Sequence, residues 1–139
     1  MSGDFELDPR LEADTWAVAE WPLSSLRLMN NADYPWFILV PRRAEMRELH
    51  ELGADDAAWL ARESVALARA MQVAFSPETL NVAKLGNIVA QLHVHHVARH
   101  AGDAAWPGPV WGVPASRGLE RREAKERIAR VLGHVAGLD

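Results

Sequence analysis

The fold of this chain is decided by the stretch Gln91-Leu92-His93-Val94-His95-His96-Val97-Ala98-Arg99. It gathers three of the six histidines of the chain within an apolar run. The Leu and Val residues between the histidines favour an extended strand over residues 90–98. Side chains alternate between the two faces of a strand, so Gln91, His93 and His95 are predicted to point the same way. At a rise of ~3.3 Å per residue, the two imidazoles lie roughly 6–7 Å apart.

Two imidazoles at that spacing can bind one phosphate group or one metal ion. Imidazole changes its charge near neutral pH, which suits it to proton transfer and to metal binding. The alternative is that both rings are hydrogen-bonded polar groups on a solvated sheet face. His96 points to the opposite face, where a hydrogen bond beneath the sheet is its expected role. His100 lies just beyond the strand and is expected to be exposed.

The composition predicts one ordinary globular domain. The chain has 139 residues, of which 49% are hydrophobic and 24% charged, enough for a single domain with a core. Its net charge is −4 and it has no basic stripe, which argues against a nucleic-acid duplex as a partner. It has no cysteine, which excludes disulfides and thiolate metal sites and fits a cytoplasmic location. Residues 1–6 are acidic, so we expect neither a signal peptide nor a membrane span.

Along the chain, polar and apolar patterns predict strands and helices of an α+β domain. A polar lead-in over residues 1–15, with one helical turn near Pro9, precedes a core of sheet and helix over residues 16–99. A Trp- and Pro-rich arm and a C-terminal helix occupy residues 100–139. The predicted strands cover residues 16–20, 25–29, 36–40, 79–83 and 90–98.

Two helices are predicted with more detail. The first covers residues 54–74, with two aspartates at its positive N-terminal end. The second runs from about residue 119 to 135, and its predicted buried edge is Ile128, Val131, Leu132 and Val135. Both helices are expected to pack on one face of an antiparallel sheet, which leaves the other face for a ligand.

The histidine stretch resembles the signature of the histidine triad (HIT) family, in which three histidines alternate with apolar residues. His93 and His95 match the second and third histidines, and Gln91 stands at the position of the first. Upstream, Leu28-Met29-Asn30 resembles the family's ribose-side strand and turn, and Gly86-Asn87 resembles the segment before the triad. The matched regions cover roughly residues 25–99, and the arm resembles that of a bacterial subgroup.

This resemblance implies a HIT-like antiparallel sheet of about five strands with one central and one C-terminal helix. It also implies nucleotidyl transfer or hydrolysis at the α-phosphate of a dinucleoside polyphosphate, a nucleoside phosphoramidate or a similar conjugate. His93 matches the nucleophile, which forms a covalent phosphoramidate while its other nitrogen donates to the main-chain carbonyl of Gln91. His95 then donates to phosphate oxygens or gives a proton to the leaving group.

The resemblance further implies a set of substrate-binding residues. Asn87 is expected to donate to phosphate and Asn30 to contact the ribose, and the set is completed by Gly86, Lys84 and Arg99. Many family members place a histidine near the position of Trp36. Tryptophan cannot do acid–base work there, but it can stack on a base or fill the core. Trp111, in the arm, can close the pocket or bury the arm by packing.

The implied mechanism requires no cofactor, although a divalent metal can accompany the substrate. The family resemblance also implies a homodimer, with the helix over residues 54–74 and the arm as its candidate interfaces. Two other functions stay open. One is a metal-binding protein with His93 and His95 as ligands, which needs a third ligand. The other is a nucleotide-binding sensor without turnover, for which Gln91 in place of a histidine is the argument.

Overall fold

The computed structural model describes residues 4–139, in which five antiparallel strands form one sheet in the order β1-β2-β3-β5-β4. The strands are β1 (Thr15–Glu20), β2 (Ser24–Met29), β3 (Trp36–Pro41), β4 (Thr79–Ala83) and β5 (Val94–Arg99). The helices are α1 (Pro9–Asp14), the 3₁₀ helix η1 (Leu49–Glu51), α2 (Ala54–Phe75) and α3 (Arg121–Leu132). The predicted α+β class, with a central and a C-terminal helix, is confirmed, and α1 adds a third α-helix.

The central strand and the long helix follow directly from their sequences. All six residues of β3 are buried, as expected for an unbroken apolar run between two neighbouring strands. Helix α2 begins with Asp55 and Asp56 in its first turn, where carboxylates interact favourably with the helix dipole. It ends at Ser76, which adopts a left-handed conformation directly before Pro77.

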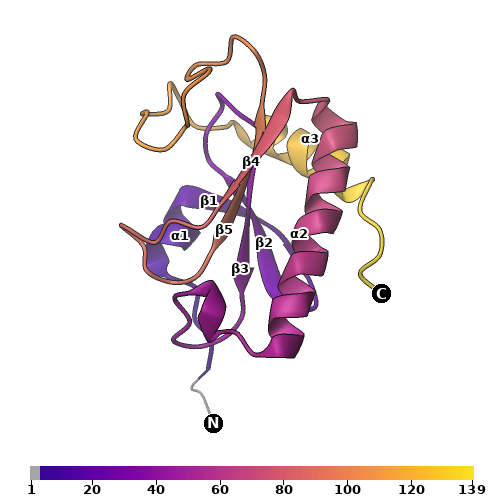
Figure 1. The fold of residues 1–139 in the computed structure, drawn as a ribbon. Coiled ribbons are helices and arrows are strands. Elements are labelled where there is room, and N and C mark those ends of the chain that lie inside the picture. The colour runs from indigo at the N-terminus through magenta and orange to yellow at the C-terminus, as the bar shows by residue number, and fades with distance from the viewer. Residues whose placement is uncertain (1–3) are drawn as a thin grey trace.

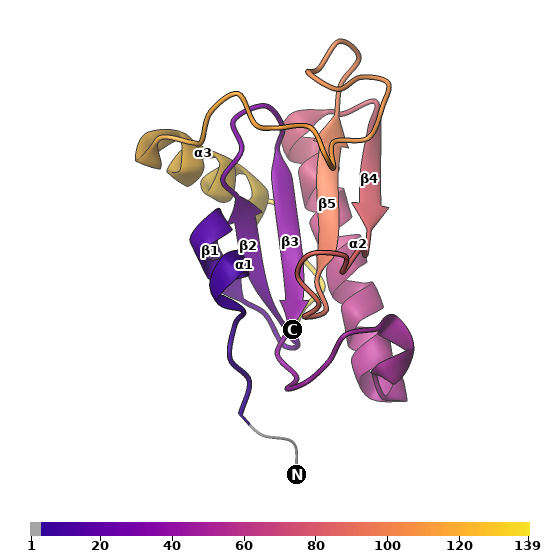
Figure 2. The ribbon, with the colours of Figure 1, turned by 90° about the vertical axis from the view of Figure 1, so that its left-hand side faces the viewer.

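The sheet has a different cover on each face, as Figures 1 and 2 show: α2 and α3 lie on one side and α1 on the other. The α2 side holds the larger apolar core, which includes Phe37 and Leu39 of β3. A second apolar cluster, built around Trp36, Ile38 and Val97, lies on the α1 side. The sheet face that was predicted to be free for a ligand is therefore only partly open, because α1 and this cluster cover part of it.

In the described part of the chain, no helix is both long and apolar enough to cross a membrane.

The histidine strand is shorter than predicted, because β5 begins at Val94 and not at residue 90. Its ladder with β3 ends at the Leu39–Val94 pair, and its ladder with β4 ends at the Ala83–His95 pair. β4 ends at Ala83, whereas β3 runs on to Pro41 without pairing with residues 90–93, which form an irregular segment that leads into β5. Within this segment the main-chain nitrogen of Leu92 donates to the carbonyl oxygen of Met46.

Helix α3 also differs from its predicted form. It covers Arg121–Leu132 and not residues 119–135, and its buried residues are Ala124 and Val131. Leu132 is 38% exposed, so the predicted buried edge was wrong at this position, whereas Val135 lies beyond the helix but still packs, partly buried, against the core. Gly133 caps the helix in a right-handed conformation, and its main-chain nitrogen donates to the carbonyl oxygen of Ala129.

Candidate active site

The structure brings His93 and His95 together in a cavity of about 360 Å³ on the α1 side of the sheet. Their ring centroids are 4.8 Å apart and the ring planes meet at 68°. Both side chains are nearly buried, at 6% and 5% exposure. The ring centroids are closer than the spacing predicted along a regular strand, and His93 lies just before β5.

His93 is held in one protonation form by the residue two positions before it. Its Nδ1 lies 2.6 Å from the main-chain carbonyl oxygen of Gln91. A carbonyl oxygen only accepts hydrogen bonds, so Nδ1 carries the proton and Nε2 of the neutral ring is bare. Burial lowers the pKa of His93, while the Gln91 carbonyl acts in the opposite direction and the charge of Lys84 lowers the pKa further. The ring is therefore neutral at neutral pH, with an unprotonated nitrogen available.

His95 is held in the complementary form by a tryptophan on the neighbouring strand. The indole Nε1 of Trp36 donates a hydrogen bond to Nδ1 of His95 over 3.0 Å. Because Nδ1 accepts this bond, the proton of the neutral ring is on Nε2. The pKa of His95 is lowered to about 3, mainly by burial and in addition by the neighbouring His93 and His96. Trp111 packs its edge against the same ring, with centroids 5.4 Å apart.

His96 lies on the opposite face of the sheet, as its place in the alternation requires. Its Nε2 lies 2.7 Å from the hydroxyl oxygen of Ser64 on α2, and its Nδ1 lies 3.2 Å from the carbonyl oxygen of Val94. Burial lowers its pKa to about 4. This imidazole bonds beneath the sheet and takes no part in the cavity.

Two of the predicted substrate-binding residues line the cavity, and a third lies at its edge. Gly86 and Asn87 are part of the wall. Gly86 has a φ of +85°, a backbone conformation that other residues rarely adopt, and a Cβ there would lie 3.0 Å from Nζ of Lys84. Lys84 itself does not line the cavity, and its ammonium group pairs with Glu48 at 2.7 Å.

Three more predicted site residues lie outside this cavity. The side chain of Gln91 does not line it; its amide bonds the main chain of Glu6 and Asp8, beside a separate hollow of about 290 Å³. Asn30 accepts hydrogen bonds from the Trp16 indole and from the main-chain nitrogen of Leu119. It lines an adjoining cavity of about 270 Å³.

Arg99 is the third, and its guanidinium is buried and hydrogen-bonded at the far end of β5. It makes two hydrogen bonds to Asp103, at 2.8 and 2.9 Å, and one to Asn81 at 2.9 Å. The side chain is 2% exposed, and the rings of Tyr34 and Trp106 flank it at 5.6 Å. Arg99 therefore fixes the start of the arm, and its buried guanidinium does not line the cavity that holds the histidines. His100 was also misjudged as exposed, since it is half-buried and bonds the carbonyl of Phe75.

We expect Arg99→Ala to lower the free energy of unfolding by ~3–5 kcal/mol, because it leaves the buried Asp103 carboxylate without its cationic partner. Asp103 retains only 8% of its side-chain exposure beside Arg99. Urea denaturation measures the effect. The matched control is Arg43→Ala, which breaks a pair with Asp56 whose arginine is 42% exposed and should cost about 1 kcal/mol or less. Equal losses in the two variants would contradict a structural role for Arg99.

The rest of the cavity wall contains Trp111 and Met29, which the sequence linked to the pocket, and residues that it did not link to a site. It includes Leu11 and Asp14 of α1, Met29 of β2, Val89, and Trp111 of the arm. Asp14, Met29 and Trp111 also line the adjoining cavity, so the two spaces share one wall. Helix α1 is too short for its sequence pattern to show that Leu11 and Asp14 line a cavity. No local sequence pattern shows that the arm contacts β5.

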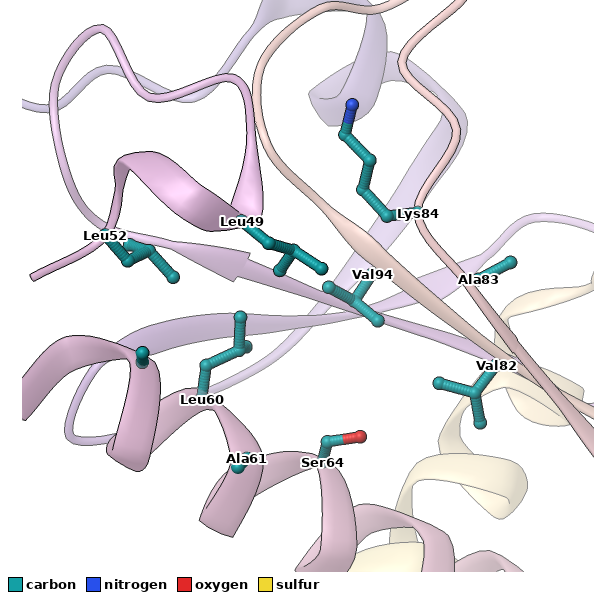
Figure 3. A pocket seen from close by; sticks show the side chains of 10 residues that line it. Leu49, Leu52, Leu60, Ala61, Ser64, Val82, Ala83, Lys84 and Val94 are labelled. Carbon is teal, nitrogen blue, oxygen red and sulfur yellow. The ribbon is translucent and has the colours of Figure 1, made fainter. Parts of the chain in front are cut away.

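A further hollow of about 420 Å³ lies between α2 and β4, away from His93 and His95. Figure 3 shows its mainly apolar lining, with Leu60 and Ser64 on the helix and Val82 and Val94 on the strands. No group of three or more His, Cys, Asp or Glu residues in the described range 4–139 is arranged to hold a metal ion. A metal site of the predicted kind therefore lacks the third ligand that it needs.

The chain is similar to one protein family in its sequence and to several solved structures in its fold. Residues 10–102 match the family model of the HIT domain. The structure is similar to a crystal structure of a histidine triad protein from Sinorhizobium meliloti 1021, with 42% identity, a TM-score of 0.92, and coverage of 94% of this chain and 97% of that one. A histidine triad protein from Bradyrhizobium japonicum is 38% identical, with a TM-score of 0.93 and coverage of 96% and 100%.

A third histidine triad protein, from Marinobacter aquaeolei VT8, is 41% identical, with a TM-score of 0.93. The match covers 99% of this chain and 100% of that one. No curated protein matches the chain.

Proposed function

The chain belongs to the HIT domain family, and we propose that it is a nucleotide hydrolase or nucleotidyl transferase that forms a covalent bond between His93 and an α-phosphate. The proposed substrates are dinucleoside polyphosphates, nucleoside phosphoramidates or similar conjugates. The observation that carries this proposal is the complementary pair of tautomers in one cavity. His93 has a bare Nε2 and His95 has a protonated Nε2, so a nucleophile and a hydrogen-bond donor lie side by side.

In the first step, Nε2 of His93 attacks phosphorus and the bond from phosphorus to the leaving group breaks. The leaving group departs with the electron pair of that bond. The His93 ring keeps its Nδ1 proton and becomes positively charged. Its hydrogen bond to the Gln91 carbonyl, at 2.6 Å, strengthens as this charge develops, which stabilises the intermediate.

In the second step, water attacks the same phosphorus and the bond to His93 breaks. The electron pair returns to Nε2, and the proton lost by the water goes to the solvent. The product is a nucleoside monophosphate and the ring regains its starting form. If an alcohol or phosphate takes the place of water, the same chemistry is nucleotidyl transfer.

The cavity wall supports a substrate that has both an apolar and an anionic part. Leu11, Met29 and Val89 offer apolar surface to a nucleoside, and Asn87 offers a side-chain amide. The Nε2–H of His95 is a donor aimed at charge that builds up on the phosphoryl oxygens, in a site from which water is largely excluded. The predicted contact of Asn30 with ribose requires a substrate that extends into the adjoining cavity.

The proposal predicts the position of the acid limb in the pH dependence of kcat/KM. Only the neutral His93 ring can attack, and its pKa is lowered from 6.5, so the ring stays neutral to lower pH than a free imidazole. We expect kcat/KM to fall with decreasing pH only below 6.5. Rates measured between about pH 4 and pH 8 test this. Lys84→Met should move the acid limb to higher pH, because it removes a positive charge that lowers the pKa of His93. An acid limb of the wild-type protein at or above pH 6.5 would contradict the assignment of His93 as the nucleophile.

A screen of nucleotide conjugates with product identification is the experiment that tests the function as a whole. Release of a nucleoside monophosphate from at least one conjugate supports the proposal. A nucleotide that binds tightly with no turnover supports the sensor instead. Stoichiometric metal in protein purified without a histidine tag supports the metal-binding alternative.

The homodimer and the cytoplasmic location remain predictions from the resemblance and from the absence of cysteine. The predicted interface element α2 borders the apolar hollow of Figure 3, which gives a second subunit an apolar surface to cover. Exposed Leu49 and Val82, at 50% and 49%, lie on the same rim.

A further inference from the structure

The hydrogen bond between Trp36 and His95 restricts what His95 can do. The two residues lie on neighbouring strands, since Trp36 pairs with Val97 and His95 pairs with Ile38. This register places the Trp36 indole diagonally across from the His95 ring on the same face of the sheet. Indole nitrogen is only a donor, so Nδ1 of His95 accepts from it for as long as the bond persists.

A ring held in this way cannot pass its Nε2 proton to another group at low cost. Release of that proton from the neutral ring leaves a buried imidazolate anion unless Nδ1 gains a proton at the same time. Nδ1 can gain a proton only if the bond from Trp36 breaks. The titratable groups near the ring are His93, His96 and Asp14 of the cavity wall, and both neighbouring imidazoles disfavour a positive charge on His95.

We propose that Trp36 is a positioning residue that makes His95 a fixed hydrogen-bond donor and not a proton donor, so that the site favours leaving groups that depart without protonation. This inference rests on the proposed function and narrows its substrate class. A phosphate leaving group departs as a stable anion, whereas an amine must be protonated before its bond to phosphorus breaks. The favoured substrates are therefore nucleotide anhydrides, and the proton that an amine leaving group needs comes from the solvent.

The first test compares two substrates of one nucleoside, a dinucleoside polyphosphate and an N-alkyl phosphoramidate, for adenosine and for guanosine. General acid catalysis contributes ~10²–10⁴-fold, and the amidate is the substrate that needs it. We expect kcat/KM for the anhydride to exceed that for the amidate by roughly 100-fold or more. In a series of aryl esters of the nucleotide, the rate should fall steeply as the pKa of the phenol rises.

The outcomes of this test separate the inference from the proposed function. Amidate cleavage as fast as anhydride cleavage, or aryl ester rates independent of the phenol pKa, would overturn the inference and leave the proposed function intact. Absence of turnover on every conjugate would contradict the proposed function itself.

The second test reads the His95 tautomer directly and needs no turnover. In ¹⁵N NMR spectra of the wild-type protein, His95 should show a protonated Nε2 and a scalar coupling between its Nδ1 and Nε1 of Trp36. Detection of an Nδ1 proton or of an imidazolium at neutral pH would overturn the inference. Because this measurement uses the wild type, it stands even if a substituted protein does not fold.

Trp36→Phe removes the N–H donor and keeps an aromatic ring. We expect a mixture of His95 tautomers and a kcat on the anhydride about 10-fold lower, equivalent to one net hydrogen bond, with KM unchanged. Trp111→Phe is the matched control for the tautomer, because its indole packs on the same ring and its Nε1 has no hydrogen-bond partner among the described residues. Trp59→Phe, on α2, is the control for the rate. An unchanged tautomer and kcat in Trp36→Phe would contradict the role.

Discussion

His93→Asn should lower kcat by roughly 10⁴-fold or more, the scale on which enzymes lose activity with their covalent nucleophile. The bare Nε2 of His93 is the atom that the proposed mechanism places against phosphorus, and no other group in the cavity can replace it. His95 presents a protonated nitrogen, and its Nδ1 is covered by Trp36. Nucleotide affinity, measured by calorimetry with a nucleoside monophosphate, should change little, since the apolar wall and Asn87 remain.

The control for this variant is His50→Asn, which changes an exposed histidine on η1. It should keep wild-type turnover and stability. Turnover by His93→Asn at the wild-type rate would refute the nucleophile. Loss of both turnover and nucleotide binding would mean that the substitution disturbs the cavity, and His93→Gln would then separate the two effects.

His95→Ala should reduce kcat by about 10²–10³-fold, the usual cost of removing one donor that stabilises transition-state charge. The expected loss is smaller than for His93, because covalent attack remains possible without the Nε2–H of His95. The substitution also leaves the Trp36 indole without its acceptor. Rates with the anhydride substrate at saturation measure the effect on kcat alone.

Formation of the covalent adduct distinguishes the loss of the His95 donor from a structural disturbance of the cavity. If His95→Ala still forms a nucleotidyl adduct on His93, only more slowly, the cavity is intact and the lost donor accounts for the rate. Full activity in His95→Ala would show that phosphoryl charge is stabilised elsewhere, with Asn87 the nearest alternative on the cavity wall.

Much of the fold can be read from local patterns. The unbroken apolar run of β3 and the helical spacing of α2 predict a central strand and a long helix within one residue of the observed bounds. The start of β5 cannot be read in this way, because residues 90–93 continue the polar and apolar alternation. The strand begins at Val94, where β4 has ended and where β3, although it runs on to Pro41, pairs only with β2; the extent of pairing is not a local property.

The candidate site, like the fold, could be predicted from the sequence only where the signal is local. The pair His93 and His95 follows from spacing, but the bond that sets the tautomer of His95 joins residues 59 positions apart. Arg99 is a predicted substrate ligand because it matches the end of the family signature, and no local pattern shows that it bonds Asp103 and Asn81 instead. Local sequence therefore locates the chemistry, while long-range contacts decide which protonation form each group takes.

The most direct test is mass spectrometry of the protein after rapid mixing with a cleavable dinucleoside polyphosphate and an alkaline quench, which preserves a phosphorus–nitrogen bond. The account predicts a transient adduct with the mass of one nucleoside monophosphate on the peptide that contains His93, absent from His93→Asn. Turnover at the full rate without any adduct, or an adduct on another residue, would contradict it.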